Sequence, residues 1–239
     1  MLEVKKIDAF RGPAQVLHRV SLSVREHEVV CLVGRNGAGK TTTMESIMGF
    51  LPVRSGQILF HGEEVSSLPV HQRARRGMGY APEGCGIFPE LTVAENMMIS
   101  RWMSAKAHLR LEAVASGNIE ERVFSVFPEV RDLMRRQGMN LSGGQRKMVA
   151  IARGIALAPT LLLLDEAFEG LAPVIIKRFR DAVLKIEDLG ISLLIAESNL
   201  VNAARIADRL YAIDRGEIIF EGKPERALED ENVMKALRG

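Results

Sequence analysis

The sequence predicts an α/β protein with a mostly parallel sheet core and an inserted helical segment. Apolar runs at residues 28–33, 161–164 and 191–196 have the length of buried strands. A helical pattern follows each run, and this alternation of strand and helix is typical of a parallel sheet covered on both faces. A largely helical stretch from 93 to about 136 interrupts the alternation, which predicts the insertion.

The first elements expected along the chain are a strand, a second strand and a helix. Residues 15–24 partly alternate apolar and polar side chains, which indicates an early strand before the one at 28–33. Three glycines then mark a loop. Residues 41–50 are predicted to form a helix that places Met44, Ile47 and Met48 on one face.

A strand and a group of helices are expected in the middle of the chain. Residues 57–61 predict a strand that ends at a turn. Within the helical stretch, residues 116–118 predict one break and Pro128 another. Residues 145–157 show a strong amphipathic helix pattern.

The last third of the chain returns to alternating strands and helices. The expected elements after the strand at 161–164 are a helix at 174–187, a strand at 191–196, a helix at 199–207, a strand at 210–213, a hairpin turn at 214–216 into a strand at 217–220, and a helical tail at 224–237. These elements lie in one domain. We expect its core at residues 1–90 and 155–239, and a helical subdomain at about 91–154.

Composition limits the function classes. The chain has 239 residues and a net charge of +2, which argues against a nucleic-acid binder that relies on a basic face. Cys31 and Cys85 give no disulfide framework, so a reducing compartment is expected. The N-terminus lacks the apolar core of a signal peptide, and no apolar run approaches the roughly 18–20 residues of a membrane span. A role in transport would therefore need a separate membrane partner.

Residues 34–41 match the phosphate-loop pattern G-x-x-x-x-G-K-[ST], between a predicted strand and a predicted helix. Glycines allow successive backbone N–H groups to face one anion, and the helix start adds partial positive charge. Lys40 is expected to reach the β- and γ-phosphates, while the Thr41 hydroxyl can ligate Mg²⁺. The residues predicted to bind ATP here are Asn36, Gly37, Ala38, Gly39, Lys40, Thr41 and Thr42.

Two carboxylates end the apolar strand at 161–164. The carboxyl edge of a parallel sheet is where ligands bind, so Asp165 and Glu166 are expected to face the phosphates. Asp165 can hold Mg²⁺ through water, and Glu166 is placed to polarise the attacking water. Without the phosphate loop, the pair could simply begin a solvated loop.

Leu141-Ser142-Gly143-Gly144-Gln145 resembles the signature sequence of ABC ATPases, and Ser142 stands 23 residues before Asp165. The resemblance covers nearly the whole chain. It implies a P-loop NTPase with a RecA-like, mostly parallel sheet, an N-terminal antiparallel β subdomain and an inserted helical subdomain. It also implies that Ser142, Gly143, Gly144 and Gln145 cap ATP bound to a second ATPase subunit. A plain helix N-cap is the alternative interpretation.

The resemblance assigns further residues to the nucleotide. Phe10 stands where the family places an aromatic ring that stacks on adenine, and Val16 follows at the usual distance. Both could equally be core residues.

Other segments resemble one subfamily, the smaller ATPase of branched-chain amino acid importers. The segments that carry this resemblance are residues 82–84, 87–89 and 170–173 together with Glu197 and Asn199. It implies integral-membrane permease subunits, a second ATPase subunit and, indirectly, an extracytoplasmic solute-binding protein. It also implies a location on the cytoplasmic face of the membrane. Relatives of this group carry urea or amides, so the solute is not fixed.

Four positions depart from the family pattern. Glu83 stands where most members have a Gln that reaches Mg²⁺, so Thr41, Glu83 and Asp165 are the expected metal ligands. Ser198 replaces the usual His, or the Gln of the subfamily, that contacts the γ-phosphate. Glu166 and Ser198 are thus the expected catalytic residues, with turnover slowed by the shorter serine. Ala167 and Phe168 replace the usual Pro-Ser.

The expected mechanism is an ATP-driven closure of two ATPase subunits that moves a permease. A P-loop kinase or another soluble NTPase would share residues 34–41 but has no need of the signature sequence. A soluble ABC protein of DNA repair or translation usually carries two cassettes or a long coiled coil. An exporter is a further alternative, although exporter ATPases are often fused to membrane spans.

Overall fold

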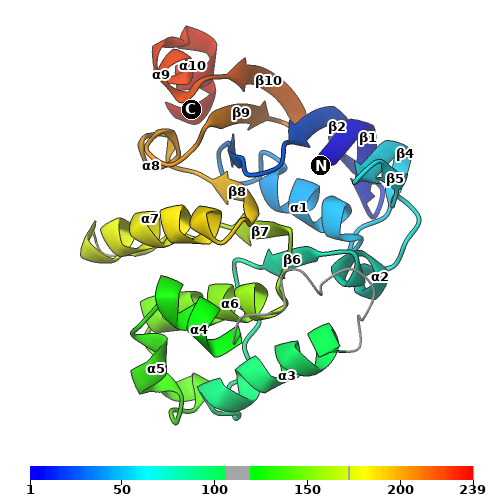
Figure 1. Ribbon diagram of the computed structural model, residues 1–239. Coiled ribbons are helices and arrows are strands. Elements are labelled where there is room, and N and C mark those ends of the chain that lie inside the picture. Colours follow the sequence, from blue (N-terminus) through cyan, green and yellow to red (C-terminus); the bar gives the residue numbers. More distant parts are fainter. Residues whose placement is uncertain (106–118, 172, 239) are drawn as a thin grey trace.

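The computed structural model describes residues 1–105, 119–171 and 173–238, and it contains two sheets and a group of helices (Figure 1). The antiparallel sheet has the order β2 (Ala14–Val24), β1 (Leu2–Arg11), β4 (Val53–Phe60), β5 (Glu63–Glu64). The larger sheet has the order β10 (Glu217–Gly222), β9 (Arg209–Asp214), β3 (Val29–Val33), β8 (Ser192–Glu197), β7 (Leu161–Asp165), β6 (Met78–Ala81). Its pairs are parallel except β10 with β9. The predicted α/β fold class, with its antiparallel N-terminal part, is confirmed.

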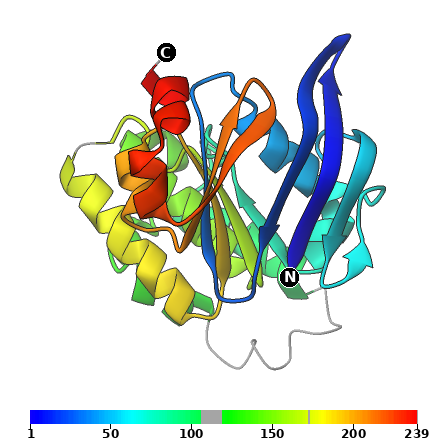
Figure 2. The same cartoon turned by 90° about the horizontal axis from the view of Figure 1, so that it is seen from above.

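Helices and the antiparallel sheet cover the two faces of the larger sheet. Cys31 of β3 packs into a core with α6 (Gly143–Ala156) and α7 (Pro173–Asp188). The next residue, Leu32, points the other way into a core with α1 (Lys40–Met48) and the antiparallel sheet. Successive strand residues face opposite sides, so a continuous apolar run is what a strand buried on both faces requires. Figure 2 shows α7 and the antiparallel sheet on opposite sides.

The helical part lies beyond the β6 edge of the larger sheet (Figure 1). Its elements are α3 (Val93–Ala105), α4 (Ile119–Val126), α5 (Val130–Leu133), a 3₁₀ turn (Gly138–Asn140) and α6. Pro128 separates α4 from α5, as predicted, whereas the break predicted at 116–118 lies outside the described residues. The domain boundary expected at about 154 falls inside α6. This helix contacts both α3 of the helical part and β6 of the larger sheet.

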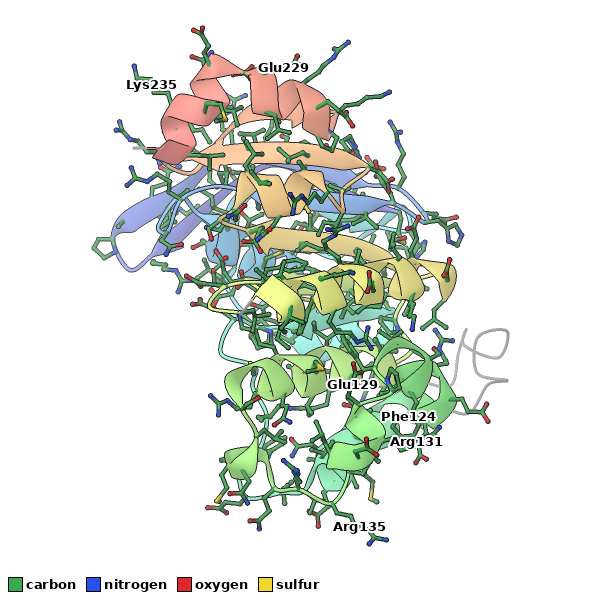
Figure 3. All side chains as sticks on the ribbon, turned by 90° about the vertical axis from the view of Figure 1, so that its left-hand side faces the viewer. Phe124, Glu129, Arg131, Arg135, Glu229 and Lys235 are labelled. Carbon is green, nitrogen blue, oxygen red and sulfur yellow. The ribbon has the colours of Figure 1, made fainter. Side chains whose placement is uncertain are left out.

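An ion pair attaches this helical part to α7, and a cation–π contact joins α4 to α5 within it. Arg178 of α7 donates from Nη2 to Glu129 Oε2 at 2.8 Å, and the Arg131 guanidinium lies 4.9 Å from the centre of the Phe124 ring. Figure 3 shows Glu129, Arg131 and Phe124 together at the α4–α5 corner, far from Glu229 and Lys235 on the C-terminal helices.

The chain end differs from the predicted single helix. It forms two helices, α9 (Pro224–Glu229) and α10 (Glu231–Arg238). The break occurs because the Asp230 carboxylate accepts the N–H groups of Asn232 and Val233, which starts a new helix. The helix predicted at 199–207 is the short α8 (Leu200–Ala204), which precedes β9 and β10. The residue-level prediction missed β1, β5, β6, α2 (Val70–Arg75) and the 3₁₀ turn. In the described part of the chain, no helix is long and apolar enough to cross a bilayer.

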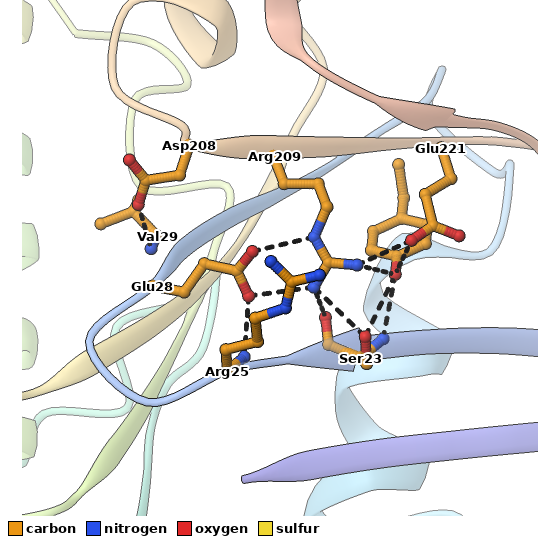
Figure 4. A network of polar contacts seen from close by, with 8 residues as sticks. Ser23, Arg25, Glu28, Val29, Asp208, Arg209 and Glu221 are labelled. Carbon is orange, nitrogen blue, oxygen red and sulfur yellow. Dashed lines mark hydrogen bonds and ion pairs between the residues drawn. The ribbon is translucent and has the colours of Figure 1, made fainter.

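A polar network around Arg209 joins the two sheets (Figure 4). The guanidinium donates to both carboxylate oxygens of Glu28 at 2.8 and 2.9 Å, and to Glu221 of β10 at 2.7 Å. It also donates to the Ser23 carbonyl of β2 at 2.9 Å. One cation thus fixes β2 against the start of β3 and against the β9–β10 hairpin, where the Tyr211 hydroxyl completes the network.

Candidate active site

The phosphate loop connects the end of β3 to the start of α1. Gly37 and Gly39 have φ of 83° and 112°, which only glycine adopts without strain, and they turn the loop into the helix. The β9–β10 turn supports the loop, because the Gly216 N–H donates to the Ala38 carbonyl at 2.8 Å. A Cβ on Gly216 would lie 2.0 Å from the Val16 carbonyl oxygen, so this close approach also requires glycine.

Lys40 and Glu166 form a buried ion pair at the start of α1. The distance from Lys40 Nζ to Glu166 Oε1 is 2.9 Å, and each side chain is about 5% exposed or less. Lys40 also donates to the carbonyls of Gly34 at 2.7 Å and Arg35 at 3.0 Å. Glu166 Oε2 is buried and has no hydrogen-bond partner among the described residues. The lysine is therefore already coordinated by three oxygens, and one carboxylate oxygen is available to a polarised group.

Asp165 ends β7 beside the first turn of α1. Its two oxygens accept hydrogen bonds from Thr41 Oγ1 at 3.3 Å and from the Tyr80 hydroxyl at 3.1 Å. Burial, together with the charges of Glu166 and Glu83, raises the pKa of Asp165 to about 6 against the lowering effect of the two hydrogen bonds. A hydroxyl and carboxylates are hard oxygen ligands of the type Mg²⁺ prefers, so Thr41, Asp165 and Glu83 fit a magnesium ion.

A cavity of about 410 Å³ opens over the phosphate loop. Its lining brings together residues of the antiparallel sheet, the phosphate loop, α1 and the loops after β6 and β7. These residues are Arg11, Val16, Asn36, Gly37, Gly39, Lys40, Thr41, Thr42, Glu83, Glu166 and Glu169. Val16, Glu83 and most of the predicted loop residues thus share one pocket, while Ala38 is buried beneath it.

Phe10 does not line this cavity, whereas its neighbour Arg11 does. The two side chains follow one another on β1 and so point to opposite faces. Phe10 is half-buried with the Arg54 guanidinium 5.7 Å from its ring centre. Arg11 reaches α1 instead, donating to Thr42 Oγ1 at 3.3 Å and pairing with Glu45. Adenine stacking by Phe10 stays a prediction. Arg11 and Glu169 were missed because no motif contains them.

Ser142 and Gln145 form a reciprocal cap at the start of α6. The Gln145 N–H donates to Ser142 Oγ at 3.3 Å, and the Ser142 N–H donates to Gln145 Oε1 at 2.9 Å. Gly143 is exposed, and a Cβ there would meet no atom within 4 Å. None of these three residues lines the cavity over this chain's own phosphate loop. The geometry suits both an N-cap and an anion site open to another molecule.

Ser198 follows the last residue of β8. It is half-exposed, and its backbone N–H donates to Glu197 Oε1 at 3.0 Å. Glu197 is buried, also accepts the Asn199 N–H at 3.1 Å, and its backbone carbonyl accepts the Gly34 N–H at 3.3 Å. Burial raises the pKa of Glu197, and the nearby Glu166 raises it further. Glu197 therefore fixes the turn that carries Ser198 against the phosphate loop.

Phe168, which departs from the family pattern, has a packing role in the structure. Its side chain is buried and its ring centre lies 6.2 Å from that of Phe179 on α7. The loop after Glu166 is thus attached to α7 by an aromatic contact.

A second hollow, which we call the lateral groove, lies between α1, α2 and β6 on one side and α3 and α6 on the other. It encloses about 420 Å³. Its wall is mostly apolar and includes Met48, Phe50, Val70, Met78, Tyr80, Cys85, Ser100, Ala150, Arg153 and Leu157. On α3, Met97 is buried in the core and Met98 is exposed. The side chains of Trp102 and Met103 are outside the described residues.

Comparison with known proteins decides the family. The model of the family described as "ABC transporter" matches residues 17–169, which contain the phosphate loop, the α6 cap and both carboxylates. The chain belongs to the ABC transporter family. As an ABC ATPase it binds and hydrolyses ATP, and such subunits form dimers and associate with transporter permeases.

Three relatives align with nearly the full chain. The lipopolysaccharide export ATP-binding protein LptB of Escherichia coli K12 is 35% identical over 97% of this chain and 93% of its own. The branched-chain amino acid transport ATP-binding protein BraG of Pseudomonas aeruginosa is 32% identical over 100% of both chains. The probable branched-chain amino acid transport protein LivF of Archaeoglobus fulgidus is 33% identical over 100% of this chain and 99% of its own.

A solved ATP-binding cassette of an ABC transporter in its ADP conformation has the same fold. It covers 100% of this chain and 98% of its own, with a TM-score of 0.84 and 27% identity.

Proposed function

We propose that this ABC ATPase powers a solute importer for branched-chain amino acids or a related amide. The observation that carries this proposal is the end-to-end match with BraG, which covers 100% of both chains. The match with LivF supports it, as do the segments at 82–84, 87–89 and 170–173 that resemble this subfamily. A periplasmic or extracellular binding protein would deliver the solute to two permease chains.

The cavity over the phosphate loop holds the nucleotide in this proposal. Backbone N–H groups of residues 36–42 and Lys40 bind the phosphates. Thr41, Asp165 and Glu83 hold Mg²⁺, which offsets the triphosphate charge. Glu166 accepts the proton of the attacking water, and Ser198 lies on the turn beside the γ-phosphate.

The cap at the start of α6 completes the site of a second subunit. Ser142, Gly143 and Gln145 do not line this chain's own cavity, and a helix start with free N–H groups binds anions. Two ATPase subunits would therefore meet head to tail and enclose each ATP between the phosphate loop of one and the cap of the other.

The lateral groove is the proposed permease contact. It is apolar, holds the half-exposed Phe50, and runs between the two parts of the molecule that α6 connects. Closure of the dimer would move these parts together with a permease segment bound between them. The subunit would then act at the cytoplasmic face of the membrane.

A solute-uptake experiment tests the import proposal. Cells that lack this chain should lose high-affinity uptake of labelled leucine, or of an amide such as urea. The wild-type chain should restore it and the Glu166→Gln variant should not. Unchanged uptake of all these solutes would contradict the proposal.

Lipopolysaccharide export is a second candidate, since LptB is 35% identical over 97% of this chain. In that case the same deletion would leave uptake intact and would cause lipopolysaccharide to accumulate at the inner membrane.

A further inference from the structure

Lys147 occupies the second turn of α6, directly after the cap formed by Ser142 and Gln145. Among the described residues, no carboxylate forms an ion pair with its ammonium group. Instead Nζ donates to two backbone carbonyls of the loop after β7, that of Glu166 at 2.6 Å and that of Glu169 at 2.7 Å. Helix α6 is thus hydrogen-bonded directly to the loop that carries Glu166.

The backbone at Glu166 needs such support. Its φ is 50°, in the left-handed region that a residue with a side chain seldom adopts unless its surroundings hold it there. The Glu166 N–H donates to the Ala196 carbonyl of β8 at 3.0 Å, which fixes one side of the residue. Its carbonyl accepts Lys147 Nζ and, at 3.3 Å, the Glu169 N–H, which fixes the other side. The Glu166 side chain owes its direction toward Lys40 to both attachments.

We propose that Lys147 is a positioning residue that couples the two nucleotide sites of the dimer. The first turn of α6 contacts the ATP of the partner subunit, and the second turn holds the catalytic carboxylate of its own subunit. Engagement of the partner's ATP then sets the position of Glu166 through one rigid helix. This inference rests on the proposed sandwich of ATP between two subunits.

Substitution of Lys147 tests the coupling. Lys147→Met keeps the length and apolar stem but removes the donors, whereas Lys147→Arg keeps donors and charge. In steady-state ATPase assays we expect Lys147→Met to lower kcat at least about tenfold, because a small misplacement of a catalytic group has effects of this size. KM should stay within about threefold, and Lys147→Arg should recover most of the lost kcat.

Lys185→Met is the matched control. Lys185 also donates to one backbone carbonyl, that of Ser125 at 3.1 Å, but it lies on α7 away from the cavity. Its kcat should equal that of the wild type. If Lys147→Met keeps the wild-type kcat, or if Lys147→Arg loses as much as Lys147→Met, the inference is wrong.

Hydrogen exchange separates positioning from general loss of structure. In the ATP-bound Glu166→Gln dimer, addition of Lys147→Met should speed exchange of the amides at 166–169 while the dimer and the amides of the α6 cap stay protected. Equal exchange at 166–169, or loss of the dimer, would overturn the inference. Failure of the proposed ATP sandwich would look different, because the Glu166→Gln chain that retains Lys147 would then form no dimer with Mg-ATP.

Discussion

Lys40 Nζ lies 2.9 Å from Glu166 Oε1, so the predicted phosphate-binding cation is paired with the predicted general base. Both side chains are buried. We expect a triphosphate bound at the phosphate loop to compete with Glu166 for Lys40, because both are anions. This exchange would free the Glu166 carboxylate to accept a proton from water.

The Glu166→Gln variant tests this exchange. It should abolish hydrolysis and also bind Mg-ATP several-fold more tightly, because it removes one negative charge beside the phosphates and a competitor for Lys40. Without nucleotide, the variant should lose about 1–3 kcal/mol of unfolding free energy, since a buried partner of Lys40 is weakened. Equilibrium binding and denaturant unfolding check both effects. Weaker binding by the variant would contradict competition between Glu166 and the phosphates for Lys40.

Ser198 offers a gain-of-function prediction. A serine at the end of β8 is shorter than the His or Gln usual in the family, and we expect it to lose their γ-phosphate contact. Ser198→Gln and Ser198→His should raise kcat by up to about 10²-fold, judged from the effect of single transition-state donors. A turnover series at saturating Mg-ATP measures this. An unchanged rate in both variants would show that the position does not limit turnover.

Arg73 gives a stability prediction. It is 2% exposed, and its guanidinium donates to the carbonyls of Ser46 and Ile47 in the last turn of α1 and to two carbonyls of the loop before α2. Arg73→Met would leave four carbonyls without this donor, two of them buried, and we expect a loss of about 2–4 kcal/mol.

The exposed Arg76 of the same segment is the control for Arg73. Arg76→Met should change the unfolding free energy by less than about 0.5 kcal/mol. Denaturant melts of both variants give the comparison, and equal effects would refute a capping role for Arg73.

Glu197 predicts a pH dependence. Burial raises the pKa of this carboxyl, so the folded state holds a proton more readily than the unfolded state. The wild-type contribution to stability therefore declines as the pH rises from the unfolded pKa through the folded one. Glu197→Gln keeps the acceptor for the Ser198 N–H but cannot titrate. Its stability relative to the wild type should increase as the pH rises above 4.5, the ordinary pKa of a glutamate, and a flat difference would show that the pKa of Glu197 is not raised.

The fold and the phosphate loop after β3 were predictable from contiguous motifs, because the chemistry of these motifs is local. Glycines, Lys40 and the carboxylates after β7 specify the phosphate cradle within a few residues. The contacts of Lys147, Arg73 and Tyr80 were not predictable in this way, because each joins segments that only the folded sheet brings together. The edge strand β6 was missed since its four residues, Met78–Ala81, give too short a pattern.

The helix break at the chain end was missed for a different reason. Asp230 caps a new helix within the tail, and the helical pattern of the sequence hid this local signal. Arg11 enters the cavity only because β1 alternates its faces beside α1.

ATP enclosed between two copies of this site is the central claim, and sedimentation of the Glu166→Gln variant tests it most directly. With Mg-ATP the variant should sediment as a dimer, and without nucleotide, or after Ser142→Arg blocks the α6 cap, it should be a monomer. A monomer at saturating Mg-ATP, with binding and folding confirmed, would contradict the account.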